Sequence, residues 1–160
     1  MKRYILVLLM VLAPVFTLSA QKHTKNVEKC SKADNVLGRY FIEDETGTSN
    51  AMFKKAADGT YYCQLCGGKP VYDKNGKMYL DVNNPDPALR NIPAHEAIII
   101  SGLKYNADKK IWEGGKIHNP QNRLMKANCT LEFVDDGKTV KIFGNLMGIG
   151  KSVYWTYLGK

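Results

Sequence analysis

The chain has 160 residues, of which 23 are Lys or Arg and 15 are Asp or Glu, giving a formal net charge of +8. The lysines are spread between apolar residues along the whole chain, whereas nucleic-acid-binding proteins concentrate basic charge into a stripe. We therefore expect a solvated basic surface and no nucleic-acid partner. Beyond the N-terminal region, no apolar run approaches the roughly 20 residues of a membrane-spanning helix.

The first 20 residues are typical of a secretory signal peptide. Lys2 and Arg3 precede an apolar run at residues 4–16, and small residues follow at 17–20. This order of basic, apolar and small segments defines such a signal, and the run is short for a membrane anchor. We expect cleavage after Ala20, export to the periplasm or the exterior, and no transmembrane anchor in the mature chain.

Residues 21–36 form a polar, lysine-rich N-terminal arm that contains Cys30. From residue 37 onward, short runs of alternating apolar and polar residues are separated by turn residues, which is typical of an all-β domain. The length of 37–160 suits a single domain with one core. The predicted strands are 39–43, 51–55, 60–65, 97–105, 110–118, 124–134, 139–145 and 152–158.

The clearest strand is 124–134, in which apolar residues from Met125 to Phe133 alternate with polar residues from Lys126 to Glu132. A period of two indicates one buried and one solvated face. Neighbouring strands joined by short turns should pair antiparallel in chain order. Eight such strands favour closure into an up-and-down barrel, because closure removes exposed sheet edges.

One long polar insert interrupts the strands between residues 65 and 97. It contains Asn84-Pro85-Asp86-Pro87, in which each proline restricts the residue before it to extended or turn geometry. Pro87 suits the first position of a short helical turn over 88–90, with Asp86 as its N-cap. A connection of this length in a compact domain is usually a lid or a binding loop.

We expect the tract 84–90 to form a rigid cap across one end of the barrel. Its prolines lower the entropy lost when a polar loop becomes ordered. Leu89 would point inward, and the guanidinium of Arg90 would bind the carboxylate of Asp81 or Asp86, or nearby backbone carbonyls.

Several of these segments together resemble a known family. They are the Asn-Pro-Asp-Pro-x-Leu-Arg tract at 84–90, the Trp-x-Gly-Gly-x-Ile strand at 112–117, the glycine-containing turn at 144–150, and Trp155. From about residue 37 onward the chain resembles the bacterial family known as domain of unknown function 2147, whose members are small exported proteins. The resemblance implies a calycin-like, lipocalin-like antiparallel barrel with an internal cavity, and it implies no catalytic activity.

The four cysteines, Cys30, Cys63, Cys66 and Cys129, all lie in the part expected to be exported. An even number of cysteines in an oxidising compartment predicts disulfides. Residues three apart in a strand are about 10 Å apart, whereas a disulfide needs Cα atoms within about 7 Å. A Cys63–Cys66 bond therefore requires a bend, and Cys129 could pair with Cys63 or with Cys30. We favour Cys63–Cys66 with Cys30–Cys129.

Cys63 and Cys66 do not indicate redox chemistry, because no helix follows to lower the pKa of a nucleophilic thiol. His95 and His118 could complete a zinc set with them, but the spacing of paired ligands is missing. We therefore expect no metal and no cofactor.

Catalysis is not indicated either, since no nucleophile elbow is present and aspartates beside prolines usually form turns. The chain is therefore predicted to be a non-catalytic exported protein that binds a small, mostly apolar ligand inside the barrel. Gly114 and Gly115 would leave room for a ligand beside Trp112. Candidate cavity or rim residues are Tyr62, Trp112, Tyr154, Trp155, Asp81, Asn84, Asp86 and Arg90.

Two alternatives stay open. One is an envelope enzyme with a site at the barrel mouth formed by Asp81, Asp86 and Arg90. The other is a solid barrel, filled by its own side chains, that serves as an interaction module. The sequence does not indicate the ligand or the oligomeric state.

Overall fold

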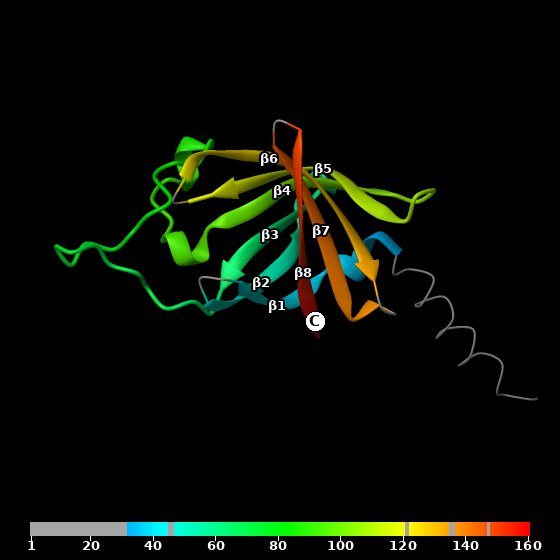
Figure 1. The fold of residues 1–160 in the computed structure, drawn as a ribbon, viewed down its shortest axis with the longest axis horizontal. Helices are drawn as coiled ribbons and strands as arrows, with labels where there is room; N and C mark the ends of the chain where they lie inside the picture. Colours follow the sequence, from blue (N-terminus) through cyan, green and yellow to red (C-terminus); the bar gives the residue numbers. More distant parts are fainter. Residues whose placement is uncertain (1–31, 45–46, 121, 135–136, 147) are drawn as a thin grey trace, which may run out of the picture. The chain divides into compact units, whose positions relative to one another are not determined.

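The computed structural model describes residues 32–44, 47–120, 122–134, 137–146 and 148–160. Eight strands form a closed antiparallel barrel in which each strand pairs with the next in sequence and β8 returns to β1 (Figure 1). The strands are β1 (Gly38–Asp44), β2 (Gly47–Lys55), β3 (Tyr61–Cys66), β4 (Ile98–Asn106), β5 (Ile111–Asn119), β6 (Asn122–Val134), β7 (Thr139–Leu146) and β8 (Ile149–Gly159). The predicted all-β, up-and-down barrel is confirmed, and each predicted strand overlaps one of these.

The predicted signal peptide, Cys30 and the arm up to residue 31 lie outside the described residues. Residues 32–160 form one compact unit. No helix within the described ranges is long and apolar enough to cross a membrane.

Aromatic side chains fill the barrel at one end. Their rings form a continuous series in which successive centroids lie 4.9 to 6.3 Å apart. In order of contact these residues are Trp155, Phe53, Tyr40, Tyr157, Phe133, Trp112 and Tyr105. Tilted and edge-to-face ring pairs of this kind add to the stabilisation that comes from burial alone. This end of the barrel is therefore solid.

The 3-10 helix η1 (Lys32–Val36) lies over this aromatic end. The Tyr40 hydroxyl donates to the Val36 carbonyl at 2.8 Å, and Trp112 Nε1 donates to the Ala33 carbonyl at 3.0 Å. Val36 itself is fully buried. Buried Tyr and Trp side chains need partners for their polar atoms, and η1 supplies them. Residues 32–36, predicted as part of the polar arm, thus belong to the barrel.

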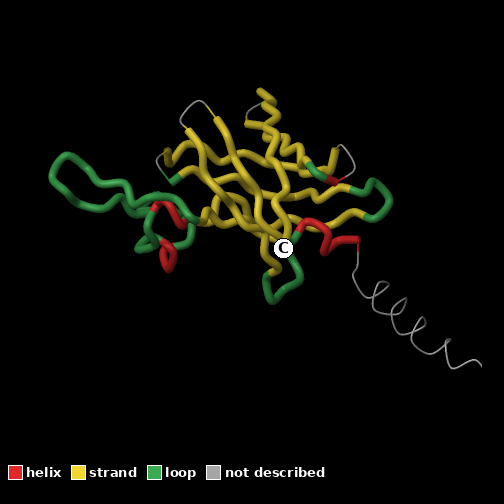
Figure 2. The backbone as a smooth tube through the Cα atoms, turned by 90° about the horizontal axis from the view of Figure 1, so that it is seen from below, coloured by secondary structure: helices red, strands yellow, loops and turns green. Residues whose placement is uncertain are grey.

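The other end of the barrel, where β3 ends and β4 begins, is called the mouth (Figure 2). Its inner wall carries aliphatic side chains, with the polar residues Asp44, Ser49 and Lys151 on the same face nearer the strand ends. The aliphatic residues are Ile42, Ala51, Leu65, Ile117, Ala127 and Val153. Gly144 adds no side chain to this wall, although a Cβ there would lie 3.0 Å from Ile117 Cδ1. The two ends of the barrel are therefore lined very differently.

The barrel closes unevenly between its first and last strands. β1 pairs with β8 only at Arg39–Gly159, Tyr40–Tyr157 and Phe41–Thr156, close to the aromatic end. Toward the mouth, residues 42–44 of β1 and residues 153–155 of β8, which would continue this register, are not paired with each other. This unpaired stretch is called the seam.

The predicted Cys63–Cys66 disulfide is wrong for this structure. Cys63, Cys66 and Cys129 are free thiols, and Cys63 and Cys66 lie on one strand that pairs with β2 without irregularity. Residues three apart in such a strand point to opposite faces, so the expected bend is absent. The predicted Cys30–Cys129 bond involves a residue outside the described part of the chain.

The two buried cysteine thiols of the barrel should make the folded protein less stable at alkaline pH. Burial raises the pKa of Cys129 to about 12, and raises the pKa of Cys63 well above its ordinary value. Above about pH 9 the unfolded chain releases thiol protons that the folded chain keeps. The free energy of unfolding should be insensitive to these groups below pH 9 and fall above it, by about 1.4 kcal/mol per pH unit for each thiol. Urea denaturation between about pH 7 and pH 11 measures this.

The control is the double variant Cys63→Ala/Cys129→Ala. It should be less stable than the parent near neutral pH, because two core side chains are shortened. Between about pH 9 and pH 10 its stability should change less with pH, since Tyr40, whose pKa burial also raises, contributes mainly above that interval. An equal pH dependence in parent and variant would contradict the assignment to the thiols.

Candidate functional site

The insert, residues 67–97 between β3 and β4, contains two short 3-10 helices, η2 (Pro87–Leu89) and η3 (Ala94–Glu96). The Asp86 side chain accepts from the Ala88 backbone N–H at 2.9 Å, and Pro87 is the first residue of η2. This confirms the predicted N-cap and proline position. Within the insert, Tyr72 and Met78 form one isolated antiparallel bridge.

Asn84 holds the proline tract in its folded form. Its side-chain oxygen accepts from the Asp86 backbone N–H at 2.9 Å, and its carbonyl accepts from Arg90 Nε at 2.9 Å. The guanidinium thus binds a backbone carbonyl, which is one of the predicted alternatives. Leu89, expected to point into the barrel, is half-buried and is not part of the core cluster.

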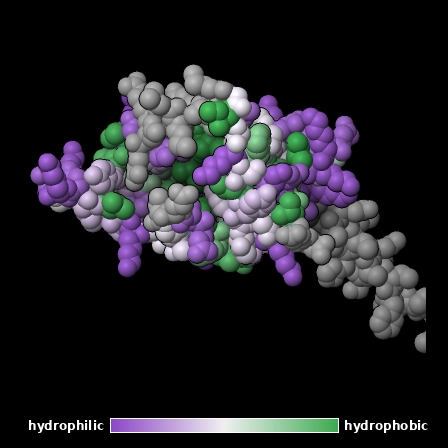
Figure 3. Space-filling view, viewed as in Figure 1, coloured by the Kyte–Doolittle hydropathy of each residue, from purple (hydrophilic) through white to green (hydrophobic). Residues whose placement is uncertain are grey.

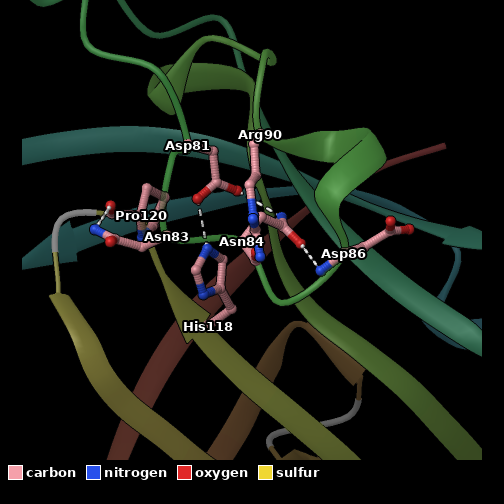
Figure 4. Close-up of polar contacts among 7 residues, drawn as sticks. All are labelled: Asp81, Asn83, Asn84, Asp86, Arg90, His118 and Pro120. Atoms are coloured by element: carbon pink, nitrogen blue, oxygen red, sulfur yellow. Dashed lines mark hydrogen bonds and ion pairs between the residues drawn. The ribbon is translucent and has the colours of Figure 1, made fainter.

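The polar centre of the insert is the fully buried carboxylate of Asp81 (Figure 4). One carboxylate oxygen lies 2.6 Å from Nε2 of His118 on β5, and the other accepts from Asn84 Nδ2 at 2.7 Å. The side chain of His118 is 10% exposed and that of Asp81 is 0% exposed. Burying a carboxylate is unfavourable unless its oxygens are paired, and here both are.

A second contact joins the insert to the same rim of the barrel. Asn83 Nδ2 donates to the Pro120 carbonyl at 3.0 Å, immediately after the end of β5. On the opposite side, Gln64 Nε2 of β3 donates to the Glu96 carbonyl at 2.9 Å. The insert is thus attached to β3 and to the β5 rim, and the Asp81–His118 pair is its buried attachment.

A carboxylate–imidazole pair occurs in catalytic triads and behind metal ligands, where the acid orients the ring. Within the described part of the chain, no Ser, Thr or Cys side chain makes a hydrogen bond to His118. No group of three or more potential metal ligands gathers in the same residues. The arrangement can therefore anchor the insert to the barrel.

Sequence reasoning placed Asp81 at the mouth but missed its partner. His118 entered only as a zinc candidate, and Asp81 was matched with Arg90. Asp81 and His118 lie 37 positions apart, and no spacing rule connects residues at that distance. The usable signal was chemical: an acid in the long insert and a histidine near the end of β5, next to Asn119-Pro120.

The predicted aromatic pocket residues do not line one cavity. Trp112 and Trp155 are buried within the aromatic end, while Tyr62 and Tyr154 lie on the outer face. The room expected beside Trp112 is also filled at Gly115, whereas Gly114 is exposed. A Cβ at Gly115 would lie 2.6 Å from Leu103 Cδ2 and 2.7 Å from Cys129 Sγ. Asp86 and Arg90 are exposed on the insert.

A cavity of about 410 Å³ lies on the outer side of the insert, lined by Tyr79, Leu80, Val82, Asn83, Ala94 and Pro120. A smaller one, of about 190 Å³, lies on the outer wall beside Lys116, Asn128 and Phe143. Val82 and Tyr79 are exposed, so the larger cavity is a surface depression next to the anchor.

Comparison with known proteins gives one match. The model of a family described as "Uncharacterized protein conserved in bacteria (DUF2147)" matches residues 38–157, from the first residue of β1 nearly to the end of β8. No curated protein and no solved structure matches the chain.

The two aspartates of the insert give a matched pair of substitutions. Asp81→Ala leaves a buried imidazole and a buried amide without their partner, and should lower the free energy of unfolding by about 3 kcal/mol. Asp86→Ala removes one exposed helix cap and should cost about 1 kcal/mol or less. Urea denaturation of both variants checks the difference, and equal losses would contradict the anchoring role of Asp81.

Proposed function

We propose that this chain, which belongs to the DUF2147 family of uncharacterised bacterial proteins, is an exported, non-catalytic protein that binds a small, mostly apolar ligand in the mouth of its barrel. The proposal moves the ligand away from the centre of the barrel, where aromatic side chains leave little space, and toward the end lined by aliphatic residues.

The exposure of Val153 is the observation on which the proposal depends. Val153 pairs with Ile142 and therefore points to the inner face of the sheet. Ile142 is 1% exposed, as expected of an inner residue, whereas Val153 is 36% exposed. Solvent thus reaches the inner wall at the mouth. In the space-filling view, hydrophobic side chains are visible behind polar ones at the centre of the face of the molecule that is turned toward the viewer (Figure 3).

The inner wall around Val153 suits an apolar guest. Ala51, Ala127 and Gly144 are small, and Leu65 and Ile117 are only partly buried. An eight-stranded barrel has room for its own side chains or for one small ligand. Large rings use that room at the aromatic end, while small side chains line the mouth. Removing apolar surface of both partners from water would drive binding.

A second candidate, an enzyme at the mouth, draws on the Asp81–His118 pair. Both carboxylate oxygens of Asp81 already have hydrogen-bond partners. Asp86 accepts from the Ala88 backbone N–H, and Arg90 donates to the Asn84 carbonyl, so neither side chain contacts Asp81. The other alternative, a barrel filled by its own side chains that serves as an interaction module, is suggested by the packed rings of the aromatic end. The exposed inner valine favours ligand binding over both.

Two tryptophan substitutions at adjacent positions test the proposal. Val153→Trp places a large ring on the inner wall, where the exposed valine leaves space, and should block the mouth. Tyr154→Trp introduces the same residue on the outer face, where Tyr154 is 58% exposed and pairs with Lys141. We expect Val153→Trp to weaken binding of the neutral fluorophore N-phenyl-1-naphthylamine at least about tenfold, which corresponds to about 1.4 kcal/mol, and Tyr154→Trp to leave it unchanged.

Binding is measured by the rise in probe fluorescence during titration, and circular dichroism checks that both variants keep the fold. Absence of probe binding to the parent protein, or equal binding to both variants, would rule out a site at the mouth.

A further inference from the structure

We propose that the mouth selects amphiphiles with an anionic head and a single apolar chain, and that Lys151 meets the head. This inference rests on the proposed function, because it names the ligand class of the same site. It begins from the position of one basic residue at the edge of a largely aliphatic wall.

The side chain of Lys151 points from β8 to the inner face of the barrel. Lys151 pairs with Gly144, and paired residues of antiparallel strands point to the same side. That side is the interior, since a Cβ on Gly144 would meet Ile117 Cδ1 at 3.0 Å and Ala127 Cβ at 3.9 Å. Lys151 also lies two residues before Val153, on the same face. The lysine is exposed, so its ammonium group is hydrated at the edge of the apolar wall.

The seam gives a head group access to this lysine. Lys151 lies on β8 two residues before Val153, which is one of the seam residues. An apolar chain lying against Ile117, Ala127 and Val153 would therefore end beside Lys151, with its head in water. Such a ligand keeps its charge solvated while it buries its chain, which avoids the cost of desolvating an ion.

Asp44 also lies on the inner face near the mouth, since it shares the face of Ile42 on β1. Asp44 already takes part in an interaction of its own. The chain as a whole carries a net charge of +8, which favours the approach of anions. An ammonium group is a compact point charge, so we expect it to accept carboxylate and sulfate heads alike.

The experiment compares four ligands with the same decyl chain: undecanoate, decyl sulfate, decanol and decylammonium. Each displaces N-phenyl-1-naphthylamine from the parent protein, from Lys151→Met and from Lys104→Met. Lys104 is a matched control, because it is exposed on the outer face of β4 opposite Glu113. Both variants lose one positive charge.

We expect the two anions to bind the parent about two- to fivefold more tightly than decanol, as suits an exposed charge pair. This preference should disappear in Lys151→Met and persist in Lys104→Met, and added salt should reduce it. Equal affinity of the parent for undecanoate and decanol, or a preference for decylammonium, would overturn the inference while leaving a site for apolar chains. If none of these ligands displaces the probe, both the inference and the proposed function fail.

Discussion

The interior of a narrow eight-stranded barrel has to be filled, and the way this chain fills it governs the rest of the molecule. Seven aromatic rings occupy one end in a continuous series of contacts. Their hydroxyl and indole groups need partners, and η1 supplies backbone carbonyls for Tyr40 and Trp112. Because the large residues are concentrated there, the opposite end is left with Ala51, Ala127 and other small or aliphatic side chains. A uniform distribution of the same residues would have produced a barrel with no distinct mouth.

The insert follows a different physical rule, since its stability comes from polar contacts. A buried carboxylate is tolerated only when its oxygens are paired, and Asp81 pairs with His118 on the barrel and Asn84 within the insert. The contacts of Asp81 therefore stabilise the folded form of the insert and also attach the insert to the barrel. Asn84 connects the two functions, because its side chain contacts Asp81 and the Asp86 backbone while its carbonyl binds Arg90.

The fold could be predicted from the sequence because it depends on local patterns. Alternation along residues 124–134 and turn residues between runs gave all eight strands, and Asp86-Pro87 gave the start of η2. The site could not be predicted to the same degree, because it depends on contacts across the barrel. Trp112 and Trp155 looked like pocket walls on their strands, but the ring series that buries them joins residues far apart in sequence. The predicted Cys63–Cys66 disulfide is wrong because β3 continues without a bend to Cys66.

The closure of the barrel also has a consequence for the time course of folding. The hydrogen bond from the Tyr157 hydroxyl to the Leu37 carbonyl joins residues 120 positions apart, and the β1–β8 pairs beside it span similar separations. Contacts of such high sequence separation carry the largest loop-closure entropy and form slowly. During synthesis, β1 is complete long before β8 leaves the ribosome. Until then, the edge of β1 that pairs with β8 has no partner strand. An unpaired edge in a growing chain is a point of aggregation until the last strand is made.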